Sequence, residues 1–198
     1  MQYAKEDIRN QILSAAREEF LRHGFEKASI RHITAAAHTS KSNLYNYFQD
    51  KDALFAAVLS PTLQAIRNGL ALAASSNAGT GVGSYTVDAQ MRNMRVVMEF
   101  IAANTDDIRL LLFHASGSSL AGFKDDVIER FADVLLDWLR QAMPGKPVSR
   151  LFVRCVAGFY ILIIEQMIRA GVNREQAEMH MAEFLRFIYS GWAGMMHN

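Results

Sequence analysis

The sequence predicts an all-α fold of about nine helices: a small three-helix domain at the N-terminus, followed by a larger helical domain. Apolar residues recur at helical spacing along most of the 198 residues, and no convincing alternation typical of β-strands is present. Prolines, which would interrupt helices, number only three. With 51% hydrophobic and 21% charged residues, the composition is that of a soluble globular protein and excludes a disordered chain.

Three helices are expected in the first domain, residues 1–52. The first should span residues 6–23, because isoleucine, alanine and phenylalanine side chains fall on one face and Gly24 follows as a stop. The second and third should span residues 30–37 and 41–48, and each follows a serine suited to cap a first helical turn.

Longer helices are expected in the second domain, residues 53–198. Asp50 caps the first of them, and Pro61 either begins a new helix or kinks a long one. A glycine-rich loop over residues 75–84 follows, and residues 173–176 form a loose capping box before the last helix. The helices expected after the loop span residues 87–103, 106–115, 120–143, 148–170 and 174–196.

Charge and cysteine content limit the class of protein and its location. The chain has 21 basic and 20 acidic residues, which excludes a surface coated with positive charge but not a local basic face. The single cysteine, Cys155, cannot form an intramolecular disulfide, so we expect a reducing, cytoplasmic location. The N-terminus lacks the apolar segment of a signal peptide. The most apolar stretch, residues 153–168, contains Arg154 and Glu165 and is shorter than a membrane span, so we interpret it as a buried helix and expect no membrane contact.

The segment from Ser29 to Leu54 is the most informative part of the chain. Its two short helices are joined by only about three residues, so the second helix should protrude in the geometry that a DNA major groove accepts. Residues 27–51 also include four basic side chains against one acidic side chain. The residues expected to face inward are Ile33, Ala36, Ala37, Leu44 and Phe48. Those expected to face outward, as groups able to contact phosphates and base edges, are Lys41, Ser42, Asn43, Tyr45 and Asn46.

A longer pattern of fixed spacings resembles the DNA-binding domain of the tetracycline-repressor (TetR) family over roughly the first 58 residues. Its members are Ile12, Leu13, Ala15, Ala16, Phe20, Gly24, Phe25, Ala28, Ser29, Ile30, Ile33, Ser40, Leu44, Tyr45, Tyr47, Phe48, Lys51 and Leu54. The resemblance implies a helix-turn-helix that binds double-stranded operator DNA, dimerisation through the last two long helices, and a ligand pocket among the middle ones.

The resemblance also implies roles for individual residues. Ser29 and Lys51 would hold phosphates, Ser40 would cap the recognition helix, and Tyr45 and Tyr47 would pack on the sugar-phosphate backbone. Lys41, Ser42 and Asn43 would lie nearest the base edges. Alternatively, Tyr47 is a half-buried tyrosine that braces Phe48, Lys51 is a solvated lysine, and Asn46 is an ordinary polar residue. The predicted DNA-binding residues are Ser29, Arg31, Ser40, Lys41, Ser42, Asn43, Tyr45, Asn46, Tyr47 and Lys51.

Three positions depart from the family pattern, which usually has glycine, valine and glycine where this chain has His38, Thr39 and Ser42. His38 should lie in the turn, where a left-handed backbone is often needed, and histidine tolerates that conformation better than most residues. The departures make the operator sequence less predictable by analogy.

No catalytic motif is found beyond residue 60: there is no paired-histidine metal motif, phosphate-binding glycine loop or nucleophile elbow. Gly117-Ser118-Ser119 is interpreted as a turn between helices. We therefore expect no enzymatic activity, no cofactor and no metal site.

Aromatic and methionine side chains are abundant in the second domain. Most should form a packed core, but such helices can also leave a mostly apolar pocket for a small-molecule effector. Glu165 lies among apolar neighbours and could pair with Arg169 one turn on or with a cationic ligand. Cys155 fits a small buried residue better than a redox switch. The candidate pocket residues are Met98, Arg109, Phe113, His114, Trp138, Phe159 and Glu165.

The last two helices have wide apolar faces that a monomer of this size would struggle to cover. We therefore expect a homodimer with an isologous four-helix contact, which would place two recognition helices on adjacent major grooves. The candidate interface residues are Phe152, Val156, Ile163, Phe184, Ile188 and Trp192.

Three functional hypotheses follow. The leading one is a transcriptional repressor that a small, largely apolar effector releases from its operator. The second is an activator, or a regulator controlled by a protein partner. The third is a helical ligand carrier or enzyme that does not bind DNA.

Overall fold

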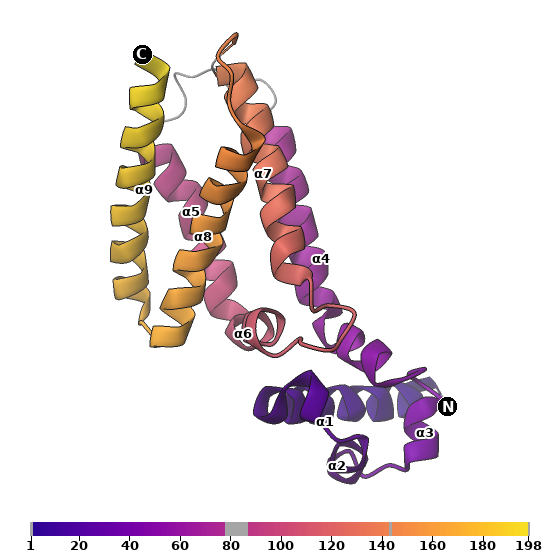
Figure 1. The fold of residues 1–198 in the computed structure, drawn as a ribbon. Helices are drawn as coiled ribbons and strands as arrows, with labels where there is room; N and C mark the ends of the chain where they lie inside the picture. Colours follow the sequence, from indigo (N-terminus) through magenta and orange to yellow (C-terminus); the bar gives the residue numbers. More distant parts are fainter. Residues whose placement is uncertain (1, 78–86, 143, 198) are drawn as a thin grey trace. The chain divides into compact units, whose positions relative to one another are not determined.

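The computed structural model describes residues 2–77, 87–142 and 144–197, and within these ranges every regular element is an α-helix (Figure 1). This confirms the predicted all-α fold of about nine helices. The glycine-rich loop predicted over residues 75–84 lies mostly outside the described residues. The helices are α1 (Gln2–Lys27), α2 (Ile30–Ala36), α3 (Lys41–Tyr45), α4 (Lys51–Asn77), α5 (Val87–Ala103), α6 (Thr105–Phe113), α7 (Phe123–Ala142), α8 (Arg150–Ala170) and α9 (Arg174–His197).

Local capping signals predicted several helix ends correctly. The backbone N–H of Ala53 donates to Oδ1 of Asp50 at 2.7 Å, which caps α4. Before α9, the N–H of Asn173 donates to Oε1 of Gln176 at 3.0 Å and the N–H of Gln176 donates to Oδ1 of Asn173 at 2.9 Å. This is the expected capping box. Gly24 has φ 69° and ψ 168°, so it interrupts α1 where a stop was predicted.

α3 ends before the predicted residue 48. Of the two alternatives for Pro61, the long helix is confirmed, since Pro61 lies inside a continuous α4. The proline is exposed, and the buried residues Leu59 and Leu63 hold the helix on either side of it. α3 stops at Tyr45 because the next N–H groups bond only three residues back, as in the 3.1 Å contact from Asn46 to the carbonyl of Asn43.

The chain divides into two compact units. The N-terminal unit contains Met1–Ile66 and Asp106–Lys124, and the C-terminal unit contains Arg67–Thr105 and Asp125–Asn198. The N-terminal unit thus extends beyond the boundary predicted after residue 52, since it includes the first part of α4 and most of α6.

The core of the N-terminal unit is built around three aromatic rings. Phe20 and Phe55 meet edge to face with ring centres 4.9 Å apart, and Phe25 lies 5.2 Å from Phe55. Ile12, Ile33, Ala37, Leu44 and Phe48 are buried around them, as predicted. The prediction for Ala36 is wrong: it is exposed, because it lies at the edge of the face that Ile33 and Ala37 share.

A buried carboxylate links three helices of the same unit. Oδ1 of Asp107 in α6 lies 2.9 Å from Nη2 of Arg17 in α1, and the hydroxyl of Thr62 in α4 donates to Oδ2 of Asp107 at 2.5 Å. Because a buried carboxylate is costly unless it is paired, these contacts fix α6 against α1 and α4.

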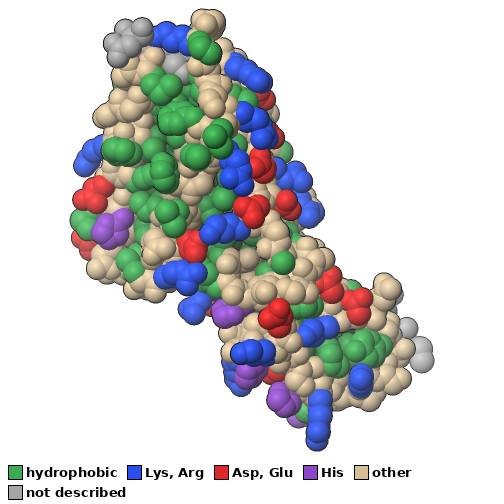
Figure 2. Space-filling view, in the orientation of Figure 1, with side chains coloured by type: hydrophobic (Ala, Val, Ile, Leu, Met, Phe, Trp, Pro, Cys, Tyr) green, Lys and Arg blue, Asp and Glu red, His purple; other side chains and the backbone are tan. Residues whose placement is uncertain are grey.

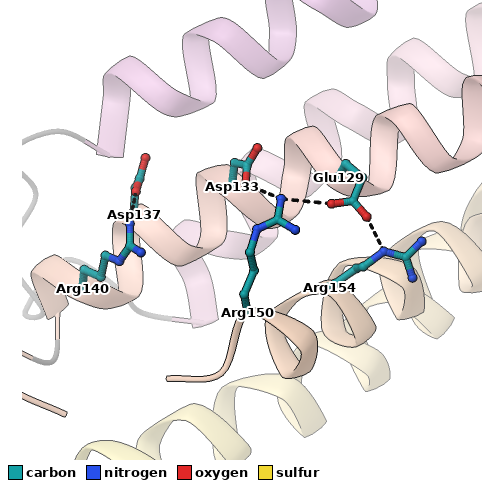
Figure 3. Close-up of polar contacts among 6 residues, drawn as sticks. All are labelled: Glu129, Asp133, Asp137, Arg140, Arg150 and Arg154. Carbon is teal, nitrogen blue, oxygen red and sulfur yellow. Dashed lines mark hydrogen bonds and ion pairs between the residues drawn. The ribbon is translucent and has the colours of Figure 1, made fainter. Parts of the chain in front are cut away.

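The C-terminal unit packs α7, α8 and α9 around a second core. Leu139, Val153 and Met181, one from each helix, are fully buried there. On the surface, Nη2 of Arg150 lies 3.0 Å from Oε2 of Glu129 and 2.9 Å from Oδ1 of Asp133, and Arg154 also pairs with Glu129 (Figure 3). The hydrogen bond from Arg154 lowers the pKa of Glu129. These exposed pairs select the register of α7 against α8 more than they add stability.

α8 is also long and apolar enough, by length and composition alone, to cross a membrane. Core helices of water-soluble proteins meet the same two criteria. Seven of its residues, including Val153, Tyr160 and Ile164, are buried in the structure. One face of this apolar helix is therefore buried in the core, as expected, but its other face is exposed.

Candidate nucleic-acid interface and effector groove

The turn between α2 and α3 has a left-handed residue at its centre. His38 has φ 49°, which confirms the backbone expected there, and no other described residue except glycine has a positive φ. The next N–H, of Thr39, donates to the carbonyl of Thr34 at 3.0 Å. Ser40 then caps α3, since its Oγ accepts the N–H of Asn43 at 3.1 Å. The turn and the start of α3 are thus held by three consecutive residues.

The start of α2 is held by a residue that the sequence did not reveal. The hydroxyl of Ser29 makes no capping hydrogen bond. Instead, the N–H of Ser29 donates to Oε1 of Glu19 at 2.9 Å, and Nδ1 of His32 lies 3.3 Å from the same oxygen. Glu19 is 9% exposed and comes from α1. Its carboxylate therefore anchors α2 on α1, and its negative charge interacts favourably with the positive end of the α2 dipole.

The outward face of α3 has the polar character that the sequence predicted. Lys41, Ser42, Tyr45 and Asn46 are exposed, whereas Leu44 is fully buried. Arg31 of α2 is exposed as well. Figure 2 shows Lys, Arg and His side chains along the surface of this unit. Such donors can bind phosphates, and the short polar groups can reach base edges.

Two aromatic residues of the interface have partners within the protein. Nζ of Lys41 lies 5.9 Å from the ring centre of Tyr45, which is 40% exposed. Tyr47 is half-buried, with its ring centre 6.5 Å from that of Phe48. This is the packing that the alternative interpretation of Tyr47 expected. A contact of Tyr47 with DNA stays a prediction.

Lys51 is neither solvated nor free. Its ammonium group donates to the carbonyls of Phe25, Glu26 and Ala28 at 2.8, 3.1 and 3.4 Å, and it lies 4.6 Å from the ring centre of Phe25. A cation at these carbonyls stabilises the C-terminal end of α1. The three bonds use all three donors of the ammonium group, so a phosphate contact, which stays a prediction, requires one of them to be exchanged.

The seven candidate effector residues do not form one cluster. Arg109, Phe113 and His114 belong to the N-terminal unit, and the other four belong to the C-terminal unit. Burial, with a smaller contribution from Arg109, lowers the pKa of His114, so the neutral ring is favoured. In the C-terminal unit, Trp138 is buried in the core and Phe159 is 50% exposed.

The buried carboxylate of Glu165 has an internal partner. Nη2 and Nε of Arg169 donate to Oε1 of Glu165 at 2.9 and 3.2 Å, which confirms the pairing one turn along α8. This satisfies Glu165 without a cationic ligand. The interpretation of Cys155 as a buried residue is wrong, because it lies exposed on α8.

A groove of about 460 Å³ lies between α5, the end of α8 and the start of α9. Met98 is the only candidate effector residue in its lining. Most of the lining is apolar: Met98, Ile101, Ala102, Ile164, Met167, Ile168, Val172 and Ala177. At its rim, Nη2 of Arg174 lies 3.1 Å from Glu99 and its Nε lies 3.0 Å from Glu178. The volume is within the range of small-molecule sites.

The candidate interface residues separate into two groups. Val156, Ile188 and Trp192 are buried in the core of the C-terminal unit, where the Trp192 ring meets that of Phe152 edge to face at 5.8 Å. Phe152 is largely exposed, and Ile163 and Phe184 are half-buried. Among the most exposed apolar side chains of these helices, Phe159 had been assigned to the effector pocket. Four others had not been selected from the sequence: Leu151, Leu162, Met179 and Phe187.

The described part of the chain brings no group of three or more His, Cys, Asp or Glu side chains together as a metal site.

Comparison with known proteins finds sequence relatives of the N-terminal helices and solved structures with the fold of the whole chain. The model of "Bacterial regulatory proteins, tetR family" matches residues 12–58. An HTH-type transcriptional repressor of Mycobacterium tuberculosis is 42% identical over 50 residues, a match that spans 25% of this chain and only 27% of that repressor. The HTH-type transcriptional repressor DhaR of a Mycobacterium species is 22% identical over 191 residues, or 96% of this chain and 81% of DhaR.

The fold agrees over the whole length. A TetR-like transcriptional regulator from Rhodococcus sp. RHA1 superposes with a TM-score of 0.65 and 21% identity, covering 94% of this chain and 96% of that one. Residues 12–58 thus match the sequence pattern of the tetR family of bacterial regulatory proteins, and the whole chain has the fold of a solved TetR-like regulator.

Proposed function

We propose that the protein is a DNA-binding transcriptional repressor that works in the cytoplasm as a homodimer and leaves its operator when a small, largely apolar effector binds. The observation that carries the proposal is the exposed polar face of α3. A buried Leu44 fixes that helix to the core, while Lys41, Ser42 and Tyr45 remain at the surface. A major groove admits such a helix, and exposed cations supply the phosphate contacts.

The exposed apolar face of α8 and α9 supports the homodimer. Leu151, Cys155, Phe159 and Leu162 follow one another at intervals of three or four residues, so they share one side of α8. On α9, Phe187 is 72% exposed. Figure 2 shows hydrophobic side chains gathered over these two helices. Single exposed leucines are common on monomers, but these side chains form a continuous apolar face. A second copy related by a two-fold axis would cover it.

The groove beside Met98 supports the effector part of the proposal. Its apolar lining suits an apolar molecule, and its rim of paired charges offers a few polar groups for orientation. The effector would act by binding one arrangement of the dimer more tightly than another. Stabilisation of the protein by apolar ligands in a thermal-shift screen tests this part separately.

The direct test of DNA binding is a gel-shift experiment with the DNA upstream of the protein's own gene at low salt. We expect a shift with the wild-type protein and none with Asn43→Ala or Tyr45→Ala, because each substitution removes a group from the exposed face of α3. Sedimentation should show that both variants remain dimers. Loss of the dimer together with the shift would argue against these roles, and no shift by the wild-type protein would refute DNA binding.

A further inference from the structure

The side chain of Asn43, on the exposed face of α3, is held in one orientation by the residue one turn before it. Its Nδ2 donates to Oγ1 of Thr39 at 2.8 Å. The Thr39 backbone is fixed in turn by its 3.0 Å hydrogen bond to the carbonyl of Thr34 at the end of α2. Thr34 is itself buried. The amide of Asn43 is therefore fixed through Thr39 to the body of the N-terminal unit.

In this contact the Thr39 hydroxyl, which can donate as well as accept, is the acceptor, and the oxygen of the amide is left for a ligand. With Nδ2 directed at Thr39, the carbonyl oxygen Oδ1 is on the other side of the amide group, and it accepts no hydrogen bond within the described residues. Nδ2 keeps a second hydrogen, because an amide has two. Asn43 is half-buried, so part of its side chain is accessible to a ligand.

We propose that Thr39 is a positioning residue for base recognition: it orients the Asn43 amide so that the side chain reads adenine in the major groove. The inference rests on the DNA binding proposed above. Adenine has an N6–H donor for Oδ1 and an N7 acceptor for Nδ2, and cytosine has only a donor. Guanine and thymine have only acceptors on that edge, so they leave Oδ1 unpaired. Valine at position 39 would lack the acceptor that holds the amide.

The test is selection of bound sequences from a pool of random duplexes by the full-length protein, followed by affinity measurements at one salt concentration. Each base is placed in turn at the position where Asn43→Ser, which keeps a short polar side chain but no amide, loses the preference. For the wild-type protein we expect adenine to be favoured over guanine and thymine by about 10-fold or more. Thr39→Val should reduce that preference to about twofold or less, while its affinity for non-specific DNA stays within about twofold.

Two further variants separate positioning from a structural role. Thr39→Ser keeps a hydroxyl acceptor and should restore the adenine preference. Thr105→Val removes a threonine hydroxyl in the C-terminal unit, one that donates to the carbonyl of Ile101 at 3.0 Å, and should leave the preference unchanged. Thermal unfolding of each variant shows that it is folded.

The outcomes are distinguishable. Wild-type base preference in Thr39→Val overturns the inference, and so does guanine or thymine at the position that depends on Asn43. In both cases DNA binding itself stands. A wild-type protein that binds no duplex refutes the proposed function as well.

Discussion

At the scale of single residues, the candidate interface depends on side chains from outside the helix-turn-helix. Glu19 holds the start of α2, and Lys51 holds the end of α1 through three carbonyls. Neither contact was predictable from local spacing. Ser29 and Ser40 look alike in sequence, yet only Ser40 caps with its own side chain. The difference arises because a carboxylate 10 residues earlier is already placed at the N–H of Ser29.

The role of Glu19 leads to a stability prediction. Glu19→Ala should lower the free energy of unfolding by about 2 kcal/mol, because it leaves the part-buried N–H of Ser29 without its charged acceptor. Urea denaturation of the purified protein measures this change. Glu18→Ala is the matched control, since the exposed Glu18 pairs only with Arg22 at 3.5 Å. Its effect should stay below about 0.5 kcal/mol. Equal effects of the two substitutions would contradict the anchoring role of Glu19.

At the scale of helices, the sequence predicted what depends on local chemistry. The limits of α5 and the capping box of α9 were predicted correctly, because a helix end depends on a few neighbouring residues. The sequence did not predict which faces of α8 and α9 lie in the core and which lie at the surface. Periodicity identifies an apolar face, but it cannot distinguish a face covered by the same chain, as at Trp192, from one left exposed, as at Phe187.

The exposed face of α9 leads to a prediction for the dimer. Phe187→Asp should weaken self-association by roughly 30-fold or more, because it removes an aromatic anchor and places a charge in an apolar contact. Analytical ultracentrifugation over a range of concentrations measures it. Val96→Asp is the control: Val96 is also exposed, but it lies on α5, outside the proposed contact. A Phe187→Asp protein that sediments like the wild type would contradict the proposed interface.

At the scale of the whole molecule, the proposed function depends on two recognition helices acting on one duplex. A single α3 has only five residues and offers few base contacts. Two copies related by a two-fold axis double those contacts, and they require operator half-sites with matching symmetry. The effector can then weaken binding by changing the spacing of the two helices, without any change at α3 itself. The family resemblance predicts this arrangement, which stays a proposal, whereas the identity of the effector depends on side chains that no fixed spacing specifies.

Chemical footprinting of the purified protein on its upstream DNA distinguishes binding by two recognition helices from other modes of binding. We expect two protected major-groove patches of related sequence on one face of the duplex, with centres about 10 base pairs or a multiple of that distance apart. Both patches should disappear together when α3 carries Asn43→Ala. A single protected patch, protection confined to the minor groove, or a footprint unchanged in Asn43→Ala would contradict the account.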